Sequence, residues 1–290
     1  MKKHQNWLQE NEQTGAKYWF TQNIEGQIEL TLTNEPIITQ YPYGGGSFNA
    51  PVQVFERVEE EPPFGLYVIG LDDVKHDQSD GDSVISCTVY KRNWELSEWA
   101  DRIVCTYATR PDRKEEAYKV IRLIMKYYNA IVFPENEDEG FKDFLERRHK
   151  LEALKHLAEG VDFSRSLNLD HNNNRAIGFS ASIKNINRLN SRVLAYTQDP
   201  IEEGGELDGY IMINDIMLLE EMIHNKPGAN ADRIRSFGLA LLYAEYLDKN
   251  NLYISRRRWN TQPQDGVTKA KTTKHTGLIN KKFNKRKRGF

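Results

Sequence analysis

The fold is decided by residues 66–73, Leu66-Tyr67-Val68-Ile69-Gly70-Leu71-Asp72-Asp73. This run is short, apolar and rich in β-branched and aromatic residues, and Pro62-Pro63 precedes it, so it predicts a buried strand rather than a helix. The strand ends on two carboxylates. Adjacent strand residues point to opposite faces of a sheet, so only one of the two can face a given site, and we expect Asp72 to do so. The alternative is that the pair only ends the strand and begins a polar loop.

The elements that follow this strand predict a mixed α/β domain. Two more strand patterns come directly after it, then a helix, a short strand and several helices. The expected strands lie at 83–90, 102–107 and 130–133, and the expected helices at 112–128, 140–157, 182–196, within 207–224, and from 232 to about 247.

Two further carboxylates stand at the ends of predicted elements. Glu135 follows the strand at 130–133, and Asp232 lies on the first turn of the last helix. An Asp at that position is often a helix cap, which is the alternative to a ligand. If the first and fourth strands are parallel neighbours, however, their carboxyl ends lie about 5 Å apart, and the late helix can bring Asp232 to the same place.

Three carboxylates at one place predict a metal site. Oxygen ligands without His or Cys suit Mg²⁺ or Mn²⁺. Two such ions about 4 Å apart would clamp the attacking water and the leaving oxygen of a phosphodiester. We therefore expect Asp72, Glu135 and Asp232 to be metal ligands.

Composition divides the 290 residues into three parts. Residues 1–64 contain strand-like pieces at 27–32 and 51–55 and a Gly44-Gly45-Gly46 loop, and are interpreted as a linker or a small β-rich lead-in. Residues 65–250 carry the strands and helices above. Residues 251–290 are a basic tail: from Arg256 onward there are twelve Lys or Arg against the single Asp265, a balance of +11, while the whole chain carries −2. Such a tail is most often a solvated extension, and attraction to phosphate is its most natural use.

The remaining composition is that of a globular protein made in a reducing compartment. No apolar segment approaches the length needed to cross a bilayer, and the N-terminus lacks the apolar core of a secretory signal. Cys87 and Cys105 lie in apolar strand patterns, so we expect buried free thiols.

Several local sequences, taken in order, resemble the nuclease domain of the large terminase subunit of tailed bacteriophages, a member of the ribonuclease H-like superfamily. The matching pieces cover about residues 65–247. They are Tyr67 to Asp72 followed by Gly81-Asp82-Ser83, Tyr128-Asn129-Ala130 leading to Glu135-Asn136 and Gly140, Gly178-Phe179 with Lys184, and Asp232 opening an Ala- and Leu-rich helix.

The resemblance implies a fold, a site and an activity. The fold is a ribonuclease H-like mixed β-sheet flanked by helices, here with the β-rich lead-in and the basic tail. Asp72, Glu135 and Asp232 match the residues that bind two Mg²⁺ or Mn²⁺ ions in that family; Asp82 matches a further acidic position and Lys184 a basic one. The implied activity is endonucleolytic cutting of concatemeric viral DNA during genome packaging.

The resemblance also implies partners and a location. These are double-stranded DNA, a terminase ATPase motor, a small subunit and a portal, in the cytoplasm of the host cell and away from membranes. No Gly-x-x-x-x-Gly-Lys-Ser/Thr phosphate loop occurs in the 290 residues. The chain is thus expected either to be an excised domain, with residues 1–64 as the linker to the motor, or to work with a motor on a separate polypeptide.

Basic residues outside the acidic site are candidates for DNA binding. They are Lys184 and Arg188, which recur with Arg192 at helical spacing, and Arg256, Arg257 and Arg258 at the start of the tail. A solvated helix face is the alternative for the first group. Two other functions stay open: a junction resolvase or transposase-type nuclease of the same fold, and a non-catalytic module that binds DNA through its tail.

Overall fold

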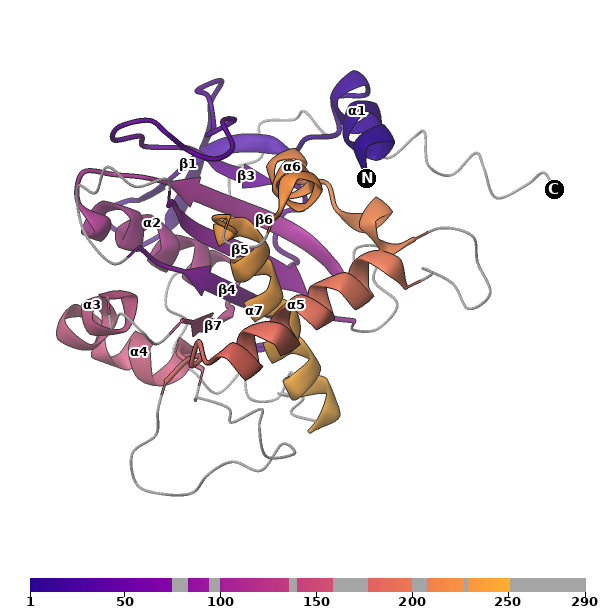
Figure 1. Cartoon of the computed structure of the whole chain (residues 1–290). Coiled ribbons are helices and arrows are strands. Elements are labelled where there is room, and N and C mark those ends of the chain that lie inside the picture. Colours follow the sequence, from indigo (N-terminus) through magenta and orange to yellow (C-terminus); the bar gives the residue numbers. More distant parts are fainter. Residues whose placement is uncertain are drawn as a thin grey trace.

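The structure is a computed structural model that describes residues 1–74, 83–93, 100–135, 140–158, 177–199, 208–226 and 229–250. Its centre is a sheet with the strand order β2-β1-β3-β6-β5-β4-β7 (Figure 1). The described strands are β1 Ala16–Gln22, β2 Ile28–Leu32, β3 Val52–Val54, β4 Tyr67–Asp72, β5 Ile85–Lys91, β6 Arg102–Thr109 and β7 Ile131–Pro134.

The predicted fold class is confirmed by the order and direction of strands β4 to β7. Strands β4, β5 and β6 form an antiparallel meander. The chain then passes through helix α2, Lys114–Tyr127, and returns as β7, which pairs with β4 in parallel. This mixed α/β sheet, in the order β6-β5-β4-β7, is the one expected of a ribonuclease H-like fold.

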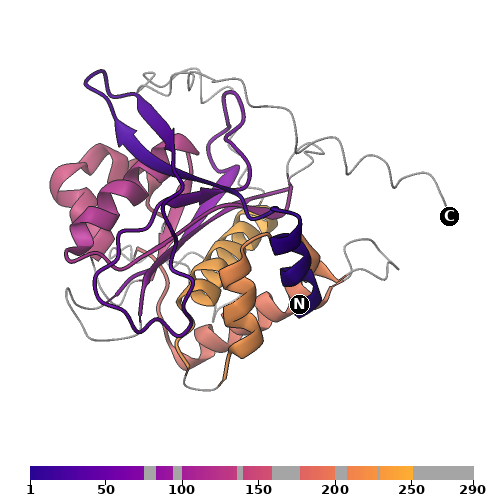
Figure 2. The same ribbon diagram turned by 90° about the horizontal axis from the view of Figure 1, so that it is seen from above.

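Helices cover both faces of the sheet. Helix α2 packs on one face with α3 Gly140–Arg148 and α4 Lys150–His156. The other face is covered by α5 Ile183–Gln198, α6 Ile216–His224 and α7 Asp232–Lys249, together with α1 Lys2–Glu10. A short 3₁₀ turn, η1 Gly209–Met212, precedes α6. Figure 2 shows the two groups of helices on opposite sides of the strands.

Strand β4 faces both layers, because its side chains alternate. Tyr67, Ile69 and Leu71 belong to the apolar cluster under α2, whereas Val68 belongs to the cluster under α7. All six residues of β4 are buried. The continuous apolar run that predicted this strand therefore follows from helices on both faces.

The N-terminal residues share the main sheet and its core. Strand β3 pairs with β6, and Tyr18, Phe20 and Val54 lie in the cluster under α2. The strand patterns at 27–32 and 51–55 are confirmed as β2 and β3, but α1 and β1 were not predicted. Helix α1 buries only Gln5 and Leu8, so its local pattern is weak, whereas the alternation of Tyr18 and Phe20, which are both buried in β1, was an available signal.

One predicted helix is divided in two. The helix expected at 140–157 ends at Arg148, and α4 begins at Lys150 after a break at His149. The break lets Phe141 and Phe144 pack against Tyr118 of α2, while His156 of α4 makes a hydrogen bond to the carbonyl of Ala130.

Two expectations from composition can be compared with the structure. Cys87 in β5 and Cys105 in β6 are buried free thiols, as predicted. Among the described residues, no helix has the length and apolar character that a membrane crossing requires.

Candidate functional site

Asp72 and Glu135 lie side by side because β4 and β7 run in the same direction. Leu71 pairs with Pro134, and the amide of Glu135 donates to the carbonyl of Leu71 at 3.0 Å. Along each strand, alternate side chains point to the same face of the sheet. Asp72 therefore shares a face with Val68, and Glu135 with Phe133, and both of these apolar residues pack in the cluster under α7. Both carboxylates thus lie on the α7 face of the sheet. Both are buried, at 1% and 9% exposure.

Asp73 lies on the opposite face, as the alternation of strand residues requires. Its Oδ2 accepts a hydrogen bond from the hydroxyl of Tyr118 in α2. Asp72 and Asp73 thus face opposite helix layers, and Asp72 is the one on the same face as Glu135 and α7.

Close packing brings the start of α7 over the ends of β4 and β5. A Cβ on Gly70 would lie 1.9 Å from the carbonyl oxygen of Ser236 and 2.5 Å from the amide nitrogen of Ala240, so only glycine allows this approach. The hydroxyl of Ser236 lies 2.8 Å from that of Ser86 and 2.9 Å from that of Thr88. Small residues on both strands thus let the helix backbone approach the sheet.

Asp232 is held at this place from outside its own helix. Its Oδ2 accepts hydrogen bonds from the amide of Val84 at 2.6 Å and from Nδ2 of Asn230 at 2.9 Å. The N-cap residue of α7 is Ala231, which has no capping side chain. These contacts of the Asp232 carboxylate differ from those of a helix cap.

Two residues that the sequence did not single out complete the surroundings. Nη1 of Arg235 lies 3.5 Å from Oε2 of Glu135 and 3.8 Å from Oδ1 of Asp72. Glu221 of α6 accepts a hydrogen bond from the amide of Ile234 at 2.8 Å. The spacing of Arg235 from Asp232, three residues along a helix, was the available signal for the first; Glu221 has no local signal.

The carboxylates of the site perturb one another. Burial raises the pKa of Asp72 well above its ordinary value, and the charges of Asp232 and Glu135 act in the same direction. Burial also raises the pKa of Asp232, against the hydrogen bonds from Val84 and Asn230. Arg235 opposes both shifts. Buried acids perturbed by charged neighbours are typical of functional sites.

The pair of Asp72 and Glu135 fits a divalent cation. Oδ1 of Asp72 and Oε1 of Glu135 are buried and accept no hydrogen bond from any residue that the structure describes. Two carboxylates, with water and a substrate phosphate, are a usual ligand set for Mg²⁺. Within the described ranges, no group of three or more His, Cys, Asp or Glu is spaced to hold a metal ion.

Of the other predicted site residues, the structure describes Lys184 and Arg188, which both lie on α5. Lys184, on the first turn of α5, is exposed, and Arg188 is half-buried. Phe179, shortly before α5, bridges to Glu135, which places the start of α5 on the side of the acidic site. Arg192 forms an ion pair with Glu245 of α7 at 3.2 Å. Asp82, Arg256, Arg257 and Arg258 lie outside the described residues.

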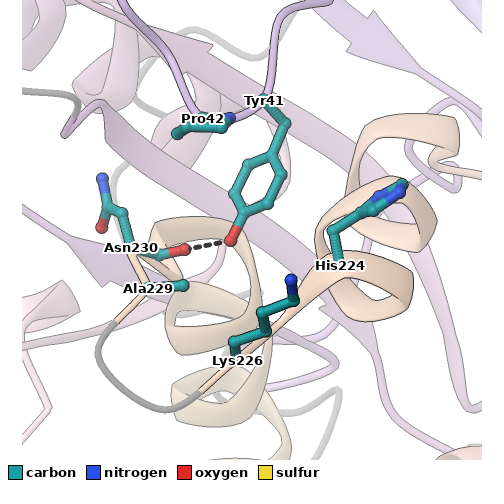
Figure 3. A pocket seen from close by; sticks show the side chains of 6 residues that line it. All are labelled: Tyr41, Pro42, His224, Lys226, Ala229 and Asn230. Atoms are coloured by element: carbon teal, nitrogen blue, oxygen red, sulfur yellow. Dashed lines mark hydrogen bonds between the residues drawn. The ribbon is translucent and has the colours of Figure 1, made fainter.

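A cavity of about 310 Å³ adjoins the loop before Asp232. Figure 3 shows Tyr41 and Pro42 facing Ala229 and Asn230, with Lys226 and His224 beside them. The hydroxyl of Tyr41 donates to the carbonyl of Asn230 at 2.5 Å. The N-terminal segment thus contacts the residue whose side chain holds Asp232.

Comparisons with known proteins give remote similarity to solved structures only. No protein-family model matches the chain, and no curated protein matches it. Among solved structures, the crystal structure of the large terminase nuclease from the thermophilic phage G20c is similar at a TM-score of 0.39 and 14% identity, over 65% of this chain and 86% of that one. At that TM-score the similarity assigns neither a family nor an activity.

Proposed function

We propose that this chain is a metal-dependent DNA endonuclease with Asp72, Glu135 and Asp232 as its catalytic carboxylates. The main support for the proposal is that the parallel strands β4 and β7 end on two adjacent, buried carboxylates. Oδ1 of Asp72 and Oε1 of Glu135 accept no hydrogen bond from the described residues. Asp232 stands at the start of a helix packed tightly over these strands. Burying this much negative charge is costly unless a cation compensates it.

Asp72 and Glu135 would hold the Mg²⁺ or Mn²⁺ ions, and Asp232 would supply a third carboxylate. When bound, such ions activate a water molecule and stabilise the charge on the leaving oxygen of a phosphodiester. The protein's own contribution is a rigid position for the carboxylates, set by the β4–β7 pairing and by the bond from Val84 to Asp232. Asp82 is proposed as a further acidic ligand.

The proposed substrate is double-stranded DNA. Lys184 and Arg188 on α5, and Arg256, Arg257 and Arg258 in the tail, would contact the phosphate backbone without reading the bases. On the resemblance described above, we propose that the chain is the nuclease part of a large terminase that cuts concatemeric viral DNA during packaging. Its partners would then be an ATPase motor, a small subunit and a portal, in the host cytoplasm.

Plasmid digestion with Mn²⁺, Mg²⁺ or EDTA tests the activity. The wild-type chain should nick and linearise supercoiled plasmid with either ion and not with EDTA. Asp72→Asn, Glu135→Gln and Asp232→Asn should each reduce the rate about 100-fold or more, because several kcal/mol of charge stabilisation are lost. Circular dichroism would verify that each variant is folded.

Asp73→Asn is the matched control. It makes the same chemical change one residue away, on the opposite face, where the amide can keep a contact to Tyr118. Its cutting should equal that of the wild type. Salt-dependent DNA binding without cutting in any metal would instead indicate a binding module, and preference for branched DNA would indicate a resolvase.

A further inference from the structure

Arg235 places a positive charge directly at the pair of carboxylates. It lies one turn after Asp232 on α7, and its Nη1 is within 4 Å of both Asp72 and Glu135. The side chain is 39% exposed, whereas the carboxylates of Asp72 and Glu135 are 2% and 9% exposed. The guanidinium therefore reaches from solvent onto a buried acidic pair.

The distances indicate attraction by charge without a tight hydrogen bond. Separations of 3.5 and 3.8 Å exceed the 2.7–2.9 Å typical of charge-assisted bonds between a guanidinium and a carboxylate. These two contacts are therefore electrostatic, and a cation bound at the carboxylates would replace the charge that they supply. The side chain of Arg235 is partly exposed.

The atom that Arg235 approaches is also an atom suited to bind metal. Oδ1 of Asp72 lies 3.8 Å from Nη1 and accepts no hydrogen bond from the described residues. A divalent cation bound to this oxygen and a guanidinium at the same oxygen would repel each other strongly. The two cations should therefore exclude one another.

We propose that Arg235 is an exchangeable counter-cation, which offsets part of the negative charge of Asp72 and Glu135 in the metal-free protein and is displaced when a divalent cation binds. The inference rests on the proposed function for the identity of that cation. Once displaced, the guanidinium lies at the rim of the site, where its planar donors match a DNA phosphate. Arg235 thus couples loading of the site to capture of the substrate.

Calorimetric titration of the DNA-free protein with Mn²⁺ tests the exchange. Arg235→Gln should bind Mn²⁺ about tenfold more tightly than the wild type, because no cation has to leave. Arg235→Lys keeps a positive charge and should stay near the wild type. The control is Arg147→Gln, which removes an exposed arginine paired with Asp143 on α3 and should leave Mn²⁺ affinity unchanged.

A melting experiment separates exchange from a permanent structural role. In EDTA, Arg235→Gln should melt below the wild type, because the carboxylates have lost their counter-charge; at saturating Mn²⁺ the difference should vanish. A melting deficit that persists in Mn²⁺, or equal Mn²⁺ affinity in Arg235→Gln and wild type, would overturn the proposal. Absence of any Mn²⁺ binding would overturn both proposals, whereas Mn²⁺ binding without DNA cutting would overturn only the nuclease.

Discussion

Asp72 occupies a position where a charged side chain costs stability. It lies in a strand whose residues are all buried, between helices on both faces, beside Glu135 and near Asp232. An apolar residue there would pack better, and the raised pKa of Asp72 expresses that cost. When several residues that reduce stability lie close together, a functional site is the usual reason for keeping them.

Glu221, on α6, is a second buried carboxyl whose burial costs stability. It is 1% exposed, and burial raises its pKa from the ordinary 4.5 to about 8, while the bond from the amide of Ile234 opposes the shift. The folded chain therefore holds a proton on Glu221 at neutral pH. The protonated carboxyl can still accept the hydrogen bond from the amide of Ile234, which lies in the first turn of α7.

Replacing Glu221 by Gln should make stability less dependent on pH. A carboxyl whose pKa is raised on folding stabilises the fold below its ordinary pKa, and this contribution is lost as pH rises toward 8. Gln keeps the acceptor and does not ionise. The free energy of unfolding of E221Q, measured in urea, should match the wild type near pH 4 and exceed it increasingly up to pH 8, by at most about 1.4 kcal/mol per pH unit. Parallel curves would contradict this.

At the scale of elements, the close crossing of α7 over β4 is what brings Asp232 to the end of the strand that carries Asp72. Gly70 permits helix and strand backbones to touch, and Ser236 exchanges hydrogen bonds with Ser86 and Thr88 at the same point. On the far side of α7, Gly238 lets Leu189 of α5 pack directly on the helix, since a Cβ there would lie 2.3 Å from Cδ2 of Leu189. The helix is thus held from both sides.

Gly70→Ala should displace α7 from the sheet. The added Cβ would lie 1.9 Å from a backbone oxygen, which no rotamer change relieves, so we expect a loss of about 3 kcal/mol in unfolding free energy. Cutting of DNA should fall more than the folded fraction does, because Asp232 moves with the helix. Chemical denaturation and plasmid digestion measure the two effects. Gly46→Ala, whose Cβ meets no atom within 4 Å, is the control and should be nearly neutral.

For the whole molecule, residues 1–64 are structurally continuous with the rest of the described chain. Strands β1, β2 and β3 extend the sheet beyond β6, and Gln5 of α1 donates to the carbonyl of Ile216 in α6. Figure 1 shows α1 beside α6. The Tyr41 contact to Asn230 links this segment to the support of Asp232.

Truncation should therefore distinguish a lead-in from an integral part of the fold. We expect residues 65–250 expressed alone to aggregate, because loss of β3 leaves the edge of β6 and the apolar face under Val54 uncovered. Residues 16–250 keep the whole sheet and should fold with reduced stability. Soluble yield and thermal melting monitored by circular dichroism compare the two. A cooperative melt of 65–250 equal to that of the full chain would show that the segment is dispensable.

Local sequence pattern determined most of the described strands and helices, although not α1 and β1. The run at 66–73, the β-branched patterns at 83–90 and 102–107, and the helical spacing at 112–128 identify strands and a helix, because the periods of these structures are imposed by nearest neighbours along the chain. Strand alternation was enough to separate Asp72 from Asp73. From the sequence, the parallel pairing of β4 with β7 was only a condition for bringing Asp72 and Glu135 together, and the structure supplies that pairing.

Only the tertiary structure decided what surrounds those carboxylates. Four contacts between described residues join positions that no local sequence period relates. They are the hydrogen bond from Val84 to Asp232, the ion pair of Arg235 with Glu135, the close approach of Gly70 to Ser236, and the hydrogen bond from Ile234 to Glu221. The sharing of one sheet by residues 1–64, and the break at His149, likewise depend on partners far along the chain. Local propensities set each element, whereas burial and charge balance across elements set the site.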